Sequence, residues 1–95
     1  MNDSEVTVLR GETARQLLDS PIYQEAYQGT RQAIFEAIAA TDPKEKETHL
    51  HLLLSLKALD RVSRYMRTVV ESGTVEKFKI EAEKKKLSFP FRRSA

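Results

Sequence analysis

Few residues of this chain have types and spacings that could support chemistry. His49 and His51 are two residues apart, so on one helix their side chains point about 200° away from each other and do not share a metal ion. Glu45 lies four residues before His49, but two ligands without a third do not make a zinc or iron site. We therefore expect no bound metal and interpret both histidines as polar residues near a helix start.

The sequence also contains no motif for nucleophilic catalysis or for nucleotide binding. Ser55 and Ser63 come with no arrangement of His and Asp that the sequence could place beside them. Gly11, Gly29 and Gly73 are isolated from one another and do not form a phosphate-binding loop. A chain of 95 residues rarely encloses a catalytic pocket. We predict a non-enzymatic protein with no cofactor and no small-molecule substrate.

Positive charge is concentrated towards the C-terminus. Residues 1–73 carry nine Lys and Arg against eleven Asp and Glu, whereas residues 74–95 carry seven against three. Such a basic segment is a candidate for nonspecific, salt-sensitive contact with DNA or for binding a larger protein, and a solvated chain end explains the pattern equally well. The residues of this basic tail are Lys77, Lys79, Lys84, Lys85, Lys86, Arg92 and Arg93.

A second basic group lies in the middle of the chain. Lys57, Arg61 and Arg64 share one stripe of a predicted helix and could follow a phosphate backbone. Asp60, however, is spaced to pair with both Lys57 and Arg64. We favour a solvated or inter-subunit salt-bridge face over a nucleic-acid site.

The elements that position these residues are predicted to be helical. Residues 1–10 are expected to be loose, and Gly11 to Asp19 suit a short helix that braces the rest. Ser20 and Pro21 form a helix start, with Ser as N-cap and Pro at the first helical position, so a helix is predicted from Pro21 to about Ala40. Phe35 lies off the apolar stripe of this helix. The brace or another subunit would cover it, and we favour the subunit.

The next helix start is the strongest local signal in the chain. Asp42 suits an N-cap, Pro43 the first helical position, and Glu45 lies three residues after the cap to close a capping box. A helix is predicted from Pro43 to about Ser72. The short connection predicts that this helix and the preceding one form an antiparallel hairpin.

This second long helix carries more apolar residues than one neighbour could cover. They fall on a heptad seam, with alternating three- and four-residue spacings, and on a second seam beside it. The first seam is His49, Leu52, Leu56, Leu59, Ser63, Met66 and Val70, and the second is Leu50, Leu54, Ala58, Val62, Tyr65 and Val69. We predict self-association into a helical bundle. The predicted subunit interface is Leu52, Leu56, Leu59, Met66 and Val70, with Phe35.

Gly73 is predicted to end the long helix, with a third, charged helix running from Val75 to Leu87. The alternative is one continuous helix that Gly73 only interrupts. Pro90 is expected to prevent helix beyond Leu87, leaving a docking peptide or a disordered end. The predicted organisation is a flexible N-terminus (1–10), a hairpin core (11–73) and a basic helix and tail (74–95).

Composition narrows the cellular setting. The chain has no Cys, which fits a reducing compartment, and no run approaches the roughly 20 apolar residues of a membrane span. The N-terminus is acidic and polar, unlike a signal peptide. We expect a protein of the cytoplasm that does not bind membranes.

One longer pattern resembles a known group. Ala14, Leu17, Leu18, Ser20, Pro21, Tyr23 and Ala26, a helix ending at Thr41, and then Leu52 through Val70 with Gly73 carry the resemblance. Over residues 11–80 the chain resembles small helical proteins encoded among the virion and packaging genes of tailed bacteriophages. The resemblance implies a small terminase subunit, a scaffold or a head-assembly accessory, in the host cytoplasm or in the virion. The DNA-binding helix-turn-helix of a small terminase subunit is lacking at the N-terminus.

The sequence thus predicts an all-α protein: an antiparallel helical hairpin with a short N-terminal helix and a charged C-terminal helix, assembled as an oligomeric bundle. The leading hypothesis is a homo-oligomeric phage protein for head assembly or DNA packaging, whose basic tail contacts DNA or a larger phage protein. The rival hypothesis is a monomeric inhibitor or adaptor that lays one face of its hairpin on a host protein.

Overall fold

The protein is all-helical and elongated. A computed structural model describes the backbone of residues 1–94 and the side chains of residues 1–86. The described residues form α1 (Asp3–Asp19), α2 (Pro21–Ala40) and α3 (Lys46–Ser94) and no strand. The molecule measures 77 × 24 × 22 Å. Its length is that of α3, because 49 helical residues at 1.5 Å each span about 74 Å.

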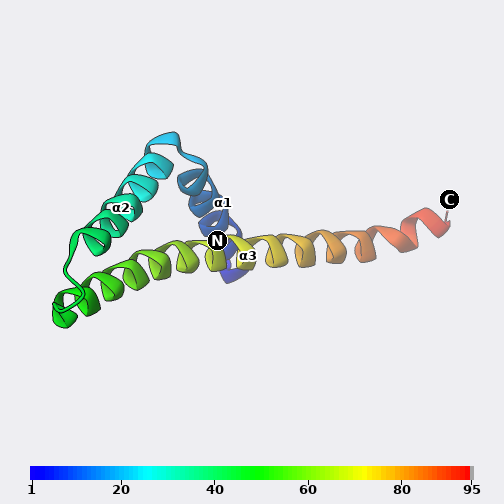
Figure 1. The fold of residues 1–95 in the computed structure, drawn as a ribbon. Coiled ribbons are helices and arrows are strands. Elements are labelled where there is room, and N and C mark those ends of the chain that lie inside the picture. The colour runs from blue at the N-terminus through cyan, green and yellow to red at the C-terminus, as the bar shows by residue number, and fades with distance from the viewer. Residues whose placement is uncertain (95) are drawn as a thin grey trace.

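Figure 1 shows how the helices are arranged. The chain starts beside the middle of α3, rises along α1 to a corner, and descends along α2 to the start of α3. α3 then runs along the base of this triangle and continues well past α1. Both shorter helices contact α3, so α3 is the element that organises the fold.

Helix α1 begins earlier than the sequence analysis expected. The side-chain oxygen of Asn2 accepts a hydrogen bond from the Glu5 N–H at 2.8 Å, which satisfies one of the free donors of the first turn. Asp3 and Glu5 also place negative charge at the positive end of the helix dipole. The segment predicted to be loose is therefore helical from Asp3, and the predicted brace is a helix of 17 residues.

Helix α2 has the predicted limits, Pro21 and Ala40. Pro21 occupies the first turn, where its missing N–H costs nothing. The side chain of Ser20 makes no capping hydrogen bond, and its backbone carbonyl accepts from the Gln24 N–H at 3.0 Å. The predicted boundary is confirmed, although the cap consists of backbone alone.

The connection between α2 and α3 differs from the predicted capping box. The Asp42 carboxylate accepts from the Lys44 N–H at 2.9 Å, and the Asp42 carbonyl accepts from the Glu45 N–H at 2.9 Å. These bonds close a tight turn, so α3 begins at Lys46 and the Glu45 carbonyl accepts from the His49 N–H. The predicted start at Pro43 is wrong because Asp42 caps the turn instead of the helix.

Helix α3 runs without a break from Lys46 to Ser94. No glycine of the described chain has a positive φ, so Gly73 does not adopt the left-handed conformation that ends many helices. The predicted stop at Gly73 and the separate helix from Val75 to Leu87 are therefore wrong. The predicted end before Pro90 is also wrong, because α3 continues past it.

Residues 1–86, whose side chains are described, enclose no apolar core. Among the residues with described side chains, no hydrophobic side chain is buried, and the buried positions are Gly11, Ser63 and Gly73. A stable domain normally buries large apolar side chains, since their removal from water is the main favourable term in folding. Stability of this fold therefore depends on close helix packing and on whatever covers its exposed apolar side chains.

Candidate functional site

The first heptad seam of α3 is used within the chain. Leu52, Leu56, Leu59, Met66 and Val70 are all half-buried, and Ser63 on the same stripe is only 5% exposed. The chain's own helices therefore already cover much of the surface that the sequence analysis assigned to another subunit. Phe35, the remaining residue of that prediction, is 42% exposed, and the Arg31 guanidinium lies 5.2 Å from the centre of its ring.

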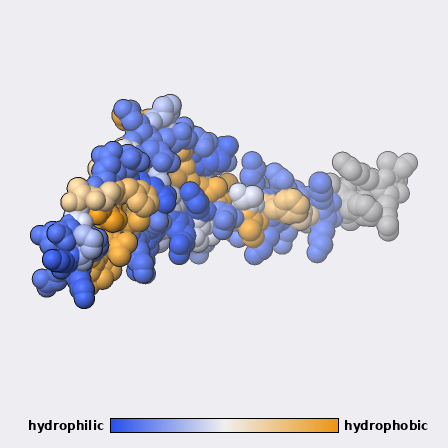
Figure 2. Space-filling view, in the orientation of Figure 1, coloured by the Kyte–Doolittle hydropathy of each residue, from blue (hydrophilic) through white to orange (hydrophobic). Residues whose placement is uncertain are grey.

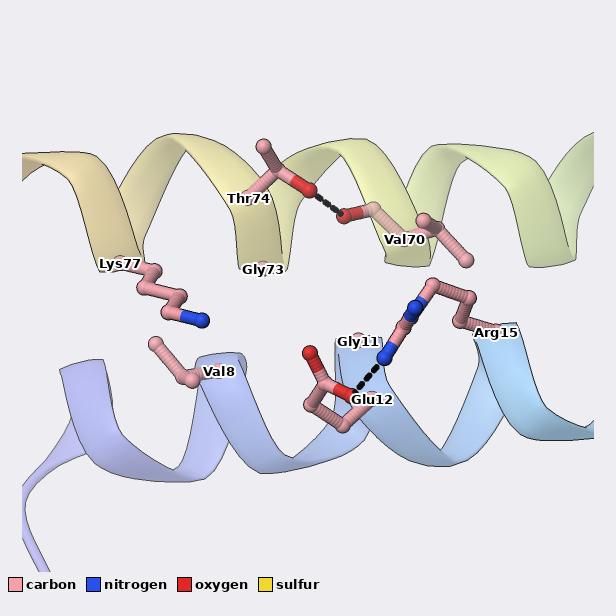
Figure 3. A pocket seen from close by; sticks show the side chains of 8 residues that line it. All are labelled: Val8, Gly11, Glu12, Arg15, Val70, Gly73, Thr74 and Lys77. Carbon is pink, nitrogen blue, oxygen red and sulfur yellow. Dashed lines mark hydrogen bonds and ion pairs between the residues drawn. The ribbon is translucent and has the colours of Figure 1, made fainter.

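Helices α1 and α3 cross at two glycines, shown in Figure 3. A Cβ placed on Gly11 would lie 2.8 Å from the Gly73 Cα and 3.2 Å from the Val69 carbonyl oxygen. A Cβ placed on Gly73 would lie 2.8 Å from the Gly11 Cα and 3.2 Å from the Thr7 carbonyl oxygen. The contact is reciprocal: each glycine faces the other backbone, and only hydrogen in place of Cβ permits this approach.

The same crossing fixes the direction of α1. Ser4 donates to the Glu76 carboxylate at 2.6 Å, while Gly11 lies against Val69 and Gly73, so the start of α1 lies toward the C-terminal side of Gly73 where the two helices cross. A small cavity of about 270 Å³ flanks the glycines, with Val8, Glu12, Arg15, Val70, Thr74 and Lys77 around it. Arg15 and Glu12, both of α1, form an ion pair beside this cavity at 2.6 Å. The sequence analysis missed this contact because Gly11 and Gly73 are 62 residues apart, and no local pattern pairs one glycine with the other.

The second seam of α3 is exposed except at Val69, which is half-buried beside α1. Leu50, Leu54, Val62 and Tyr65 are between 52 and 64% exposed, and Ala58 among them is exposed too. In Figure 2, hydrophobic side chains are visible on the surface of α3 near its start as well as farther along the helix. Single exposed apolar residues are common, but a stripe along several helical turns is typical of an interaction surface. We name Leu50, Leu54, Ala58, Val62 and Tyr65 the open seam.

Helix α2 is tied to α3 by polar contacts at two points. Tyr27 donates to the Asp60 carboxylate at 2.7 Å, and His49 Nε2 lies 3.1 Å from the Thr41 carbonyl oxygen at the end of α2. The hydrogen bond to Asp60 raises the pKa of Tyr27, burial and the Asp60 charge add to the rise, and Arg31 and Ser63 oppose it. These contacts tie α2 to the first part of α3, and in Figure 1 the two helices diverge from the connection between them towards the corner of α1 and α2. The predicted close antiparallel hairpin stays a prediction.

The ion pairs predicted for Asp60 are absent. The Asp60 carboxylate forms an ion pair with neither Lys57 nor Arg64, all three of which have described side chains. The Asp60 carboxylate instead accepts a hydrogen bond from the Tyr27 hydroxyl. Lys57 and Arg64 therefore lack the ion pairs with Asp60 that their spacing predicted, although Asp60 lies beside them. Periodicity could not reveal this, because Tyr27 belongs to another helix.

Tyr27, Asp60 and three arginines line a cavity between α2 and α3. Its volume is about 240 Å³, and its walls are Tyr27, Arg31, Asp60, Ser63, Arg64 and Arg67. Arg31 comes from α2, and Arg64 and Arg67 come from α3. The Tyr27 hydroxyl already donates to Asp60, but guanidinium groups are donors, so the three arginines suit this cavity to an anion.

The remaining candidates lie apart from one another. Lys77, Lys79, Lys84, Lys85 and Lys86 are exposed on the part of α3 that leads to its free end. Arg92 and Arg93 lie outside the residues whose side chains are described. No three His, Asp or Glu side chains within the described part of the chain are grouped closely enough to hold a metal ion. In that same part, no helix has an apolar stretch that could cross a bilayer.

No relative identifies the chain. No protein-family model, curated protein sequence or solved structure matches it. The geometry of the open seam, the glycine crossing and the arginine-lined cavity therefore carries the functional argument.

Proposed function

We propose that the protein is a non-enzymatic assembly module in which the helical hairpin of α2 and α3 self-associates through the open seam. The single observation that carries this proposal is the absence of any buried hydrophobic side chain among residues 1–86, combined with the exposed stripe from Leu50 to Tyr65. Burial of apolar surface contributes about 25 cal/mol for each Å² removed from water. A second copy that covers this stripe supplies the burial that one chain lacks.

The spacing of the open seam suits a helix as the partner, and the order of its residues suits a second copy. Its residues repeat every three or four positions, as in helices that pack along one another. Leu54 and Val62 lie four residues on either side of Ala58. An antiparallel pair of α3 helices centred on Ala58 would bring the smallest side chain to the closest approach and place larger ones on both sides. Such a twofold arrangement is the commonest form of self-association.

The mass in solution tests the proposal. The full chain, 10.9 kDa as a monomer, should scatter light as a discrete multiple of that mass at both low and high salt. Leu54→Asp should shift the mass to that of the monomer, because it places a charge in the middle of the apolar contact.

Leu53→Asp is the matched control. Leu53 is 47% exposed and Leu54 is 52% exposed, but the two side chains are about 100° apart around the helix, so Leu53 lies at the edge of the open seam beside Leu50 and not in its middle. Its variant should keep the oligomeric mass. A wild-type chain that stays monomeric at every concentration, or equal dissociation by the two variants, would contradict the proposal, and the first of these results would favour the adaptor hypothesis.

The narrower hypothesis is head assembly or DNA packaging in a tailed bacteriophage. It rests on the sequence resemblance and stays a prediction, as does contact of the basic tail with DNA or with a larger phage protein. The seam proposal does not depend on either.

A further inference from the structure

We propose that the cavity between α2 and α3 binds a phosphate group through Arg31, Arg64 and Arg67. This site is separate from the open seam and does not depend on self-association. It also differs from the basic tail, because its cations come from the middle of the chain and from two helices.

Charge is the first argument. Three arginines and one carboxylate residue, Asp60, line the cavity, so its lining carries a net charge of +2. Asp60 already accepts a hydrogen bond from Tyr27 at 2.7 Å and forms no ion pair with the described side chains. Lys57 and Arg61 lie on the adjoining surface of α3 and add to the positive field. Like charges held close together repel, and an anion bound between them offsets that repulsion.

The arginines are held on two helices that contact each other. Arg64 and Arg67 are three residues apart on α3 and therefore neighbours on the helix surface. Arg31 faces them from α2, and its guanidinium lies 5.2 Å from the centre of the Phe35 ring, which limits its freedom. The Tyr27 to Asp60 hydrogen bond holds the two helices together beneath the arginines. The donors are thus presented by two helices that are fixed relative to each other.

The number of donors favours phosphate over carboxylate. Each guanidinium offers a planar fork of N–H groups, and three forks match the several oxygens of a phosphate better than the two of a carboxylate. A phosphate monoester or inorganic phosphate carries a charge of about −1.5 to −2 near pH 7, close to the opposite of the lining charge. A volume of about 240 Å³ accommodates such a group. The phosphate is free or part of a nucleic-acid backbone. A backbone phosphodiester carries one charge and two unesterified oxygens, so the lining charge and the three forks favour a free phosphate or a monoester.

The test is titration of the full chain with inorganic phosphate, followed through the side-chain N–H signals of its arginines in NMR spectra, with chloride at equal ionic strength as the reference. Saturable shifts should appear for Arg31, Arg64 and Arg67 and not for Arg15, which is paired with Glu12. Arg64→Gln should weaken phosphate binding about tenfold or more, because it removes a charge-assisted fork. Lys79→Gln removes the same charge outside the cavity and should leave the affinity unchanged.

Competition with a duplex DNA oligonucleotide distinguishes a nucleic-acid backbone from a small phosphate as the ligand. If DNA displaces phosphate and Arg64→Gln weakens DNA binding, the site takes a nucleic-acid backbone. If phosphate binds and DNA does not displace it, the ligand is a small phosphate. Uniform shifts of all arginines, or equal effects of Arg64→Gln and Lys79→Gln, would overturn the proposal. Dissociation of the oligomer by Arg64→Gln without any phosphate response would also overturn it and assign the arginines to a salt bridge between subunits.

Discussion

The two helices that pack on α3 do so in opposite ways. α1 meets α3 backbone to backbone at Gly11 and Gly73, where no side chain intervenes. α2 meets α3 through side chains, with the Tyr27 to Asp60 hydrogen bond and the contact of His49 with the Thr41 carbonyl. The contact of α1 depends on the absence of a Cβ at both glycines, and the contact of α2 depends on the Tyr27 hydroxyl, the Asp60 carboxylate and the His49 ring. The glycine crossing should therefore tolerate no added volume, whereas the α2 contact should tolerate volume and respond to changes in protonation.

The largest expected effect comes from filling the glycine crossing. Gly11→Ala places a Cβ 2.8 Å from the Gly73 Cα, and because the obstructing atoms belong to the backbone, no rotamer change relieves the clash. The helices must separate, and we expect a loss of about 2 kcal/mol in the free energy of unfolding despite the better helix propensity of Ala. Chemical denaturation followed by circular dichroism, at one protein concentration, measures the loss.

Gly29→Ala is the control for this prediction. A Cβ on Gly29 meets nothing within 4 Å, so only the helix propensity changes and stability should rise by up to about 1 kcal/mol. The same substitution, Gly to Ala, should therefore lower the free energy of unfolding at Gly11 and raise it at Gly29. An equal rise in stability for both variants would show that α1 and α3 do not approach each other this closely.

The glycines also show how far sequence reasoning reaches. The start of α2 was predictable because Ser20 and Pro21 act locally. Gly73 was interpreted as a helix stop by the same local logic, and that was wrong because its role is set by Gly11, which is 62 residues away in the sequence. A glycine that ends a helix and one that admits a neighbouring helix look alike in a sequence.

The two seams of α3 illustrate a second limit. Periodicity found both seams, because apolar residues at three- and four-residue spacings mark a helix face whatever covers it. It could not decide which seam faces the chain's own helices, since that depends on how α1 and α2 return to α3. The subunit interface was accordingly assigned to Leu56 and its neighbours, which are half-buried within the chain, while Leu54 on the other seam is exposed.

A smaller effect is expected at the α2 contact, and it should depend on pH. The hydrogen bond to Asp60 raises the pKa of Tyr27 above its usual value of about 10. Above pH 10 the unfolded chain loses the Tyr27 proton while the folded chain still holds it, so the stability from this bond is complete below that pH and is lost as the pH rises through the folded pKa. Thermal unfolding between pH 8 and about pH 11 should show this decline.

Substitution of the tyrosine isolates this contribution. Tyr27→Phe keeps the ring and removes the hydroxyl, so it should cost about 1 kcal/mol at neutral pH and make the alkaline decline less steep. Tyr23→Phe is the matched control, because Tyr23 stacks on Tyr27 with ring centres 6.3 Å apart and its hydroxyl makes no hydrogen bond among the described contacts. An alkaline decline of equal slope in wild type and Tyr27→Phe would exclude the Tyr27 hydroxyl as its source.

The smallest expected effect is that of the ion pair beside the glycine crossing. Arg15 donates to Glu12 at 2.6 Å, and this bond, followed by the Arg15 charge, lowers the pKa of Glu12. A lowered carboxyl pKa stabilises the fold above the usual value and ceases to do so as the pH falls through the lowered one. Both side chains are well exposed, however, so water and salt screen the pair. Glu12→Gln should therefore leave the unfolding midpoint at pH 7 nearly unchanged, and the difference from wild type should vanish in high salt. If Glu12→Gln destabilised the protein as much as Gly11→Ala does, the crossing would be held by charge, and the contrast between a backbone contact of α1 and a polar contact of α2 would be wrong.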